Sequence, residues 1–183
     1  MNKIGTHNSA TGEKGKGFLS LLVSPFAKCQ RKTIEEQYNS GCRLFDLRVK
    51  NCNGKLCFAH GLWKSDKNIF QVLEFLDDHE CFVMLTYEGK LKTNEEVKSF
   101  SDAVNILKKA FCKIRWLEIS VKYGDNNKWQ TIIKAEHSCP NQKNFIPLDG
   151  SSWHTFIPIP WLWNKLKKRK DFNEDIFLLV DFL

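Results

Sequence analysis

Three short motifs contain side chains that can act as acids, bases or charge partners. Gly-Thr-His-Asn-Ser at the start of the chain contains His7 and Asn8, directly after a predicted strand. Phe-Asp-Leu-Arg contains Asp46 and Arg48, which point to the same side of a strand because strand side chains alternate. His60 ends the strand that follows. In parallel β/α architectures the carboxyl ends of the strands carry the chemistry, so we expect these residues to share a site.

Two histidines and an arginine suit in-line phosphoryl transfer. A neutral imidazole can take a proton from an attacking hydroxyl, and a protonated imidazole can give one to the leaving oxygen. A guanidinium can bind two phosphate oxygens and balance the charge of the transition state. A carboxylate behind one imidazole would fix its tautomer, and Asp181, at the end of an apolar strand, is the candidate. Taken singly, each histidine also fits a structural role, and Asp46 with Arg48 also fits a structural ion pair.

The order of these motifs resembles the catalytic X region of the bacterial phosphatidylinositol-specific phospholipase C family. The resemblance covers about residues 4–63, includes Gln37, Gly41 and Arg43 between the motifs, and returns in Leu-Leu-Val-Asp-Phe at the end of the chain. Between Glu88 and Ile176 it is thin.

The resemblance implies a distorted, imperfectly closed β/α barrel and a phosphodiesterase of the lyase or hydrolase class. Such enzymes make the inositol 2-hydroxyl attack phosphorus, which releases diacylglycerol and a cyclic inositol phosphate. By motif position, His7 is the general base and Asp181 its supporting carboxylate. His60 is the general acid and Arg48 the phosphate clamp. Asp46 is expected to support the His60 side of the site.

One position departs from the resembled pattern. Asn8 stands where metal-free members of the family commonly have an aspartate, and an amide lacks the charge that would raise the pKa of His60. Calcium-dependent relatives have asparagine there, so Asn8, Asp46 and Glu88 could offer oxygens to Ca²⁺. Arg48 argues against that alternative because a guanidinium repels the cation. We therefore expect no metal and no cofactor, with Asn8, Arg48 and Glu88 as substrate contacts.

The elements alternate as in an α/β protein. With 183 residues the chain predicts a single domain over 1–183, shorter than the roughly 250 residues of a complete eight-stranded barrel. We expect a shortened TIM-like β/α barrel of six or seven strands, with truncation at both ends as a hypothesis. The predicted strands are 2–6, 42–49, 56–59, 81–87, 117–121, 129–134 and 176–182, with 81–87 buried on both faces; the predicted helices are 33–41, 68–79, 94–111 and 158–170.

The charge balance favours an anionic partner. Lys and Arg number 28 against 21 Asp and Glu, a formal charge of +7. With the motifs, this predicts a phospholipid substrate at an anionic membrane surface. The basic run Lys165–Lys170 beside Trp161 and Trp163 is either a solvated helix face or a membrane patch. No nucleic-acid motif is present, and we expect a monomer that does not bind nucleic acid.

The cysteines and apolar segments bear on location. Seven cysteines without a Cys-x-x-Cys pair favour thiols in a reducing compartment such as the cytoplasm, with Cys42, Cys57, Cys81 and Cys112 as small apolar residues, although one or two disulfides stay compatible. No segment is apolar enough to predict a transmembrane helix, and residues 17–27 follow a motif strand, so they are not a secretory signal. Members of the resembled family are commonly secreted, so location stays open.

Two other functions remain. A glycerophosphodiester phosphodiesterase would need a Glu-x-Asp metal pair, where this chain has Asp46 and Arg48. A non-catalytic module could instead bind phosphoinositides or anionic membrane through a degenerate site.

Overall fold

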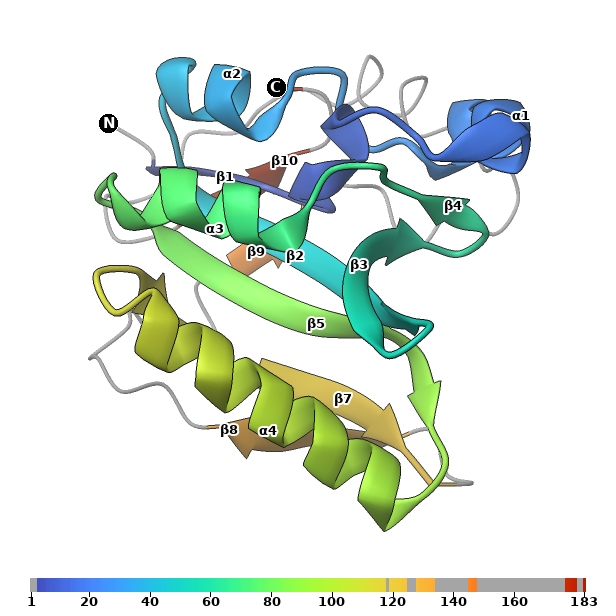
Figure 1. Ribbon diagram of the computed structural model, residues 1–183. Coiled ribbons are helices and arrows are strands. Elements are labelled where there is room, and N and C mark those ends of the chain that lie inside the picture. Colours follow the sequence, from blue (N-terminus) through green and yellow to red (C-terminus); the bar gives the residue numbers. More distant parts are fainter. Residues whose placement is uncertain (1–2, 118, 125–127, 134–144, 148–176, 181–182) are drawn as a thin grey trace.

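The computed structural model describes residues 3–117, 119–124, 128–133, 145–147, 177–180 and 183 (Figure 1). The elements in chain order are β1 (Lys3–Thr6), the 3-10 helix η1 (Ser9–Gly12), α1 (Gly17–Ala27), α2 (Ile34–Asn39), β2 (Cys42–Cys52), β3 (Lys55–His60), β4 (Trp63–Lys64), α3 (Ile69–Asp77), β5 (Phe82–Leu91), α4 (Asn94–Ala110), β6 (Arg115–Trp116), β7 (Ile119–Tyr123), β8 (Lys128–Ile133), β9 (Phe145–Pro147) and β10 (Phe177–Val180).

The strands form one mixed sheet. Its main path runs β8-β7-β5-β2-β1-β10-β9, and β3, β4 and β6 branch from it. The pairs from β7 through β5, β2 and β1 to β10 and β9 are all parallel, which confirms the predicted α/β pattern. β8 is antiparallel to β7, because the four residues between them can form only a hairpin. Among the described strands, the path does not close on itself.

The three predicted helix starts that fall within the described residues are confirmed. Thr33 and Thr93 each accept a hydrogen bond from the backbone N–H three residues on, at Glu36 and Glu96, and each glutamate bonds back to its threonine N–H. Asn68 caps α3 through Phe70 N–H. These reciprocal caps satisfy backbone donors that a helix leaves unpaired, so the local sequence fixes where the helices begin.

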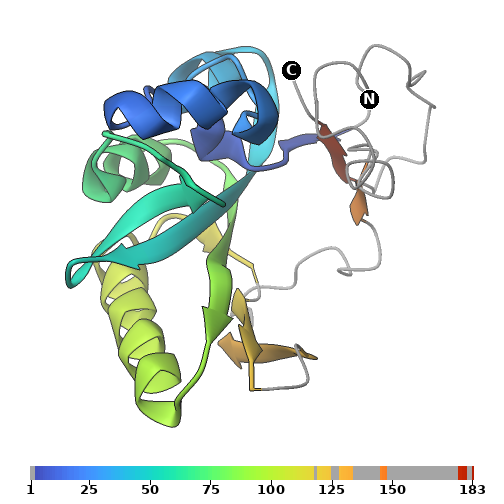
Figure 2. The ribbon, with the colours of Figure 1, turned by 90° about the vertical axis from the view of Figure 1, so that its right-hand side faces the viewer.

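The main core lies between the sheet and helices α3 and α4, which flank it on one side (Figure 2). Val83 and Leu85 of β5 belong to this core and are fully buried. The opposite face of β5 is less covered: Phe82 and Met84 are half-buried and pack on a smaller cluster of Leu44 and Leu117. The prediction that residues 81–87 are buried on both faces is therefore wrong for the second face.

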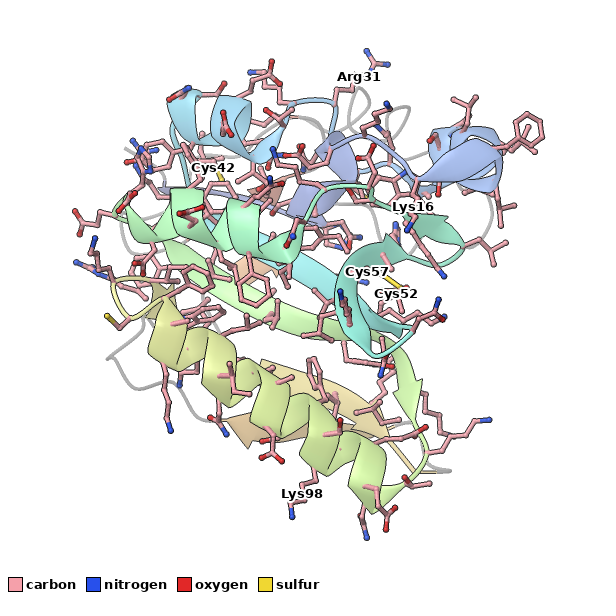
Figure 3. The ribbon with its side chains drawn as sticks, in the orientation of Figure 1. Lys16, Arg31, Cys42, Cys52, Cys57 and Lys98 are labelled. Atoms are coloured by element: carbon pink, nitrogen blue, oxygen red, sulfur yellow. A yellow bond between two sulfur atoms is a disulfide. The ribbon has the colours of Figure 1, made fainter. Side chains whose placement is uncertain are left out.

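Helix α1 buries its small side chains and exposes its large ones. Ser20 and Ala27 are buried, and Ser20 Oγ exchanges hydrogen bonds with the backbone of Lys64 in β4. The large apolar side chains turn to solvent, and Figure 3 shows side chains projecting from this helix. They are Phe18, Leu19, Leu21, Leu22 and Phe26. In the described part of the chain, no helix has both the length and the apolar character to cross a membrane.

A disulfide joins Cys52 and Cys57 across the β2–β3 hairpin (Figure 3). Asn53 and Gly54 form the predicted turn, both with positive φ, at 55° and 81°. The turn folds the two strands back on each other and so brings the two thiols together.

The bridge corrects the prediction that Cys57 is a free apolar thiol. Cys112 is free but exposed, so that prediction is also wrong. Cys42 and Cys81 are buried and free as predicted. Asp181, the predicted helix 158–170, Trp161, Trp163 and the basic run at 165–170 lie outside the described residues.

Candidate active site

His7 follows β1 and is held by the turn that opens η1. Asn8 has left-handed backbone angles, φ 47° and ψ 47°, a conformation that asparagine tolerates better than most residues. Asn8 C=O accepts hydrogen bonds from Thr11 N–H and Thr11 Oγ. Gln30, fully buried, donates from Nε2 to His7 C=O at 3.1 Å. The turn fixes His7 at the carboxyl end of its strand.

The neighbours of His7 define its protonation state. Arg48 Nη2 lies 2.9 Å from His7 Nε2, and a guanidinium can only donate, so Nε2 accepts. Asn8 Nδ2 is 3.2 Å from the same nitrogen. Asp46 Oδ2 is 3.9 Å away. This arrangement suits a neutral His7 ring, with the lone pair of Nε2 facing Arg48.

Arg48 lies between two carboxylates. Its Nε is 3.5 Å from Asp46 Oδ2, and its Nη1 is 3.6 Å from Glu88 Oε2. Burial works to lower the pKa of Arg48, but the charges of Asp46 and Glu88 raise it on balance. The alternation of β2 places Arg48 and Asp46 on one side, as predicted.

His60 is held by acceptors. Its Nδ1 lies 2.7 Å from Ala27 C=O, the last residue of α1, so Nδ1 carries a proton and donates. The Cys29 side chain hydrogen-bonds the ring, and Asn8 Nδ2 lies 3.4 Å from His60 Nε2. Burial lowers the pKa of His60, but Cys29, Ala27 C=O and the charge of Glu88 together raise it above its ordinary value. Ala27 C=O, Cys29 and Glu88 favour the protonated ring, whereas the Asn8 amide beside Nε2 is a donor and does not.

Glu88 links the arginine to the turn after His60. Its Oε1 accepts a hydrogen bond from Gly61 N–H at 3.0 Å, while Oε2 faces Arg48. Gly61 has φ 60°, a conformation that glycine adopts without strain. One carboxylate of β5 therefore positions both β2 and the β3–β4 turn.

Five buried polar atoms in the described part of the chain have no hydrogen-bond partner, and three of them belong to this cluster: Asn8 Oδ1, Asp46 Oδ1 and Arg48 Nε. Buried polar atoms are nearly always paired in folded proteins. Their concentration at one place identifies a surface prepared for a polar ligand. Next to it lies a cavity of about 310 Å³, lined by Arg48 and Glu88 together with Thr86, Tyr87, Gly89, Lys90 and Lys122.

The structure brings together six of the seven predicted site residues: His7, Asn8, Asp46, Arg48, His60 and Glu88. Asp46 was expected on the His60 side; instead it lies beside His7 and accepts a hydrogen bond from Asn8 N–H at 3.2 Å. The seventh, Asp181, lies outside the described residues. Sequence reasoning missed Cys29 and Gln30, which follow α1 and match no motif.

A cation would compete with Arg48 for its ligands. Of the three residues in the calcium alternative, Asp46 and Glu88 both face the guanidinium. Within the described ranges, no three His, Cys, Asp or Glu side chains gather so that they could hold a metal ion. The donor set fits a guanidinium-centred anion site better than a calcium site.

Solved structures similar in fold are bacterial phosphatidylinositol-specific phospholipases C. The enzyme from Listeria monocytogenes is 14% identical and has a TM-score of 0.54, covering 100% of this chain and 74% of its own. Two structures of the enzyme from Staphylococcus aureus, one a single-residue variant, are 14% and 15% identical with TM-scores of 0.57 and 0.53. Both alignments cover 100% of this chain, and they cover 85% and 86% of the two S. aureus chains, respectively. No protein-family model and no curated protein matches the chain. At these identities the likeness concerns the fold.

Proposed function

We propose that the protein is a phosphodiesterase that cleaves phosphatidylinositol-type lipids. The observation that carries this proposal is that two histidines with different hydrogen-bond partners flank Arg48 and Asn8 in one cluster. His7 Nε2 lies beside the guanidinium of Arg48, whereas His60 Nδ1 donates to Ala27 C=O, and the pKa of His60 is raised. Acid-base catalysis of an in-line displacement needs such a pair on the two sides of a phosphate.

In the proposed reaction, His7, His60 and Arg48 each have one role. His7 Nε2 takes the proton of the inositol 2-hydroxyl as its oxygen bonds to phosphorus. The bond from phosphorus to the glycerol oxygen breaks, and His60 Nε2 gives its proton to that oxygen. The guanidinium of Arg48 holds the phosphate and balances its charge. The products are diacylglycerol and a cyclic inositol phosphate, which makes the first step that of a lyase.

The cavity beside Arg48 has the size and lining that a small polar headgroup requires. Its volume of about 310 Å³ and its lysines, Lys90 and Lys122, suit a polyhydroxylated ring attached to a phosphate. Glu88 can accept hydrogen bonds from ring hydroxyls. In the same proposal, the open sheet is a shortened barrel and Asp181 is the carboxylate that supports His7.

The exposed side of α1 favours the surface of a lipid membrane as the place where the protein acts. We name Phe18, Leu19, Leu21, Leu22, Phe26 and Leu62 the apolar face. Leu62, in the turn after His60, is 66% exposed, and Phe18 is 73% exposed. Lys14, Lys16 and Lys64 are exposed beside this face. Clustered apolar side chains rimmed by lysines bind anionic lipid interfaces, and this cluster adjoins the site through Ala27 and His60.

The deciding experiment is turnover. Purified protein incubated with phosphatidylinositol vesicles is expected to release cyclic inositol phosphate, with and without a chelator, because Arg48 does the work of a cation. His7→Ala and His60→Ala, each checked for folding, are expected to lose this release. Active His7→Ala protein would overturn the mechanism.

Membrane binding is tested separately. Replacing Phe18 and Leu22 by serine is expected to weaken binding to anionic vesicles by tenfold or more, since each buried apolar side chain contributes about 1.5–3 kcal/mol. The matched control is Ile106→Ser, which removes a 63%-exposed apolar side chain from α4. Equal weakening in the control would argue against the apolar face.

A second candidate is a lipid-binding protein without turnover. Asn8, an uncharged residue between the two histidines, favours it. Binding of phosphatidylinositol vesicles with no product at any pH would identify this function.

A further inference from the structure

The backbone of the turn that contains His7 is held by side chains. Strand pairing between β1 and β10 ends at Thr6, opposite Val180, so His7 is the first residue beyond the paired part of β1. The carbonyls of residues 6–9 each accept a hydrogen bond from a side chain. The donors are, in chain order of the carbonyls, Ser9 Oγ, Gln30 Nε2, Thr11 Oγ and Gln37 Nε2.

Gln30 joins this turn to a second segment of the chain. The residue is fully buried and lies three positions after the end of α1. Its Nε2 donates to His7 C=O at 3.1 Å, and its Oε1 accepts from Leu183 N–H at 3.2 Å. Leu183 follows β10, the strand that lies beside β1 (Figure 1). A carboxamide offers the donor and the acceptor of a peptide group, so Gln30 continues the hydrogen bonding between these two segments beyond the paired strands.

The backbone of Gln30 is bonded to the same turn. Gln30 N–H donates to Thr11 Oγ at 3.1 Å, and Thr11 Oγ in turn donates to Asn8 C=O at 2.7 Å. Asn8 directly follows His7. Gln30 therefore contacts the turn through its backbone as well as its side chain, and this fixes the place of its carboxamide.

The imidazole of His7 depends on the position of its backbone. Nε2 lies 2.9 Å from Arg48 Nη2 and 3.2 Å from Asn8 Nδ2. Strand pairing alone does not fix the direction of the His7 side chain, because that pairing ends one residue earlier. Misplacement of a reacting group by about 1 Å can cost about 10²-fold in rate. A bond to the His7 carbonyl therefore bears on where the proposed base lies.

We propose that Gln30 is a positioning residue for His7. This inference rests on the proposed function. The buried carboxamide bridges His7 C=O and Leu183 N–H and so keeps Nε2 of the base beside Arg48. Gln30 neither gives nor takes a proton in the reaction, and it acts only through the place of the imidazole.

The first test separates kcat from KM. Gln30→Met keeps the length of the side chain but removes both hydrogen bonds. We expect kcat on phosphatidylinositol to fall by about 10–10²-fold with little change in KM, because the base is displaced while the phosphate contact of Arg48 remains.

Gln37→Met is the matched control for this test. Gln37 is also a fully buried glutamine, and its Nε2 donates to the carbonyls of Ser9 and Lys32. This variant is expected to lose stability but to keep its kcat. Unchanged kcat in Gln30→Met, or equal losses in the two variants, overturns the proposal.

The second test restores the bridge by protonation. In Gln30→Glu, a protonated carboxyl has one donor and one acceptor and can make both bonds, whereas a carboxylate can only accept. Burial raises the pKa of the introduced carboxyl. The ratio of variant to wild-type kcat is therefore expected to be close to one at low pH and to fall as the carboxyl loses its proton.

The titration of the introduced carboxyl is followed by its ¹³Cδ signal. Gln37→Glu is the control, and its kcat ratio is expected to stay constant with pH in the folded protein. A constant ratio in Gln30→Glu while the carboxyl titrates overturns the proposal.

The third test reads His7 without turnover. Donors at Nε2 favour the ring tautomer with its proton on Nδ1, which ¹⁵N NMR of histidine-labelled protein detects. The signal is assigned with His7→Gln. Gln30→Met is expected to show a mixture of tautomers, and Gln37→Met the wild-type tautomer. An unchanged tautomer in Gln30→Met overturns the proposal. If wild-type protein shows no turnover but the tautomer changes, the proposed function fails and the positioning role stands.

A fourth test needs only wild-type protein and so covers variants that fold poorly. The carboxamide protons of Gln30 are expected to exchange with solvent at least about tenfold more slowly than those of Gln71, an exposed glutamine of α3. Equal exchange at the two side chains would show that the bridge does not persist in solution and overturns the proposal.

Discussion

His7 and His60 have the same side chain but opposite surroundings. Arg48 and Asn8 direct donors at Nε2 of His7, whereas Ala27 C=O and Cys29 bind His60. His7 is 9% exposed and its turn is tied down by Gln30, while His60 ends a hairpin strand. Donors favour a neutral imidazole and acceptors a charged one, so the two proposed roles differ through the neighbours and not through the histidines themselves.

The largest expected effect is the loss of kcat on removal of either histidine, and its dependence on the leaving group distinguishes the two residues. His7→Ala is expected to lose about 10²–10⁴-fold in kcat on phosphatidylinositol and on an inositol phosphodiester with a nitrophenol leaving group, because both need the base. His60→Ala is expected to lose a similar factor on the lipid but much less on the nitrophenyl ester, whose leaving group departs without a proton. Steady-state kinetics on both substrates checks this.

The distinction between the two histidines fails if His7→Ala and His60→Ala lose the same activity on the nitrophenyl ester. Equal losses on the nitrophenyl ester would mean that His60 does not act as the acid. His79→Ala, which changes a histidine packed on Tyr38 and Phe75, is the control for removal of an imidazole elsewhere.

In the proposed mechanism Arg48 lies beside the base and binds the phosphate, so its loss is expected to lower activity on both substrates. Arg48→Lys keeps the charge but loses bidentate binding of the phosphate and the hydrogen-bond donor to His7. We therefore expect kcat to fall by about 10²–10³-fold. Arg115→Lys, at an exposed arginine paired with Glu80, is the control. Full activity in Arg48→Lys would contradict the clamp.

Asn8 lies between the two rings, and a charge there should act on His60. In Asn8→Asp the pKa of His60 is expected to rise by about one unit beyond its already raised value, because a carboxylate stabilises the charged ring. The acid form then persists to higher pH, so the high-pH limb of kcat/KM moves upward. A downward shift of the high-pH limb, or no shift, would show that position 8 does not influence the pKa of His60.

The smallest effect concerns Glu88, whose charge reaches His60 from β5. Glu88→Gln is expected to lower the pKa of His60 and so move the high-pH limb downward by a few tenths of a unit, because Arg48 already screens this charge. Glu95→Gln, in the exposed first turn of α4, is the control. An equal shift in the control would show that net charge, not position, is responsible.

Local patterns predicted much of the fold. The helix starts at Thr33 and Asn94 and the Asn53–Gly54 turn depend on near neighbours in sequence, so the local sequence locates them. The alternation of β2 likewise placed Asp46 and Arg48 on one side. The burial of β5 was only partly predicted, because an apolar run does not tell which face a helix covers.

By itself, the sequence determined the helix starts and the alternation of side chains along the strands, and so which side chains share a face. Only the tertiary structure decided their partners. Asp46 lies beside His7 and not His60, Cys29 binds a ring 31 positions away along the chain, and α1 turns its apolar side chains outward. Spacing fixes the direction of a side chain on its own element, whereas its neighbours depend on how distant elements pack, which no local pattern encodes.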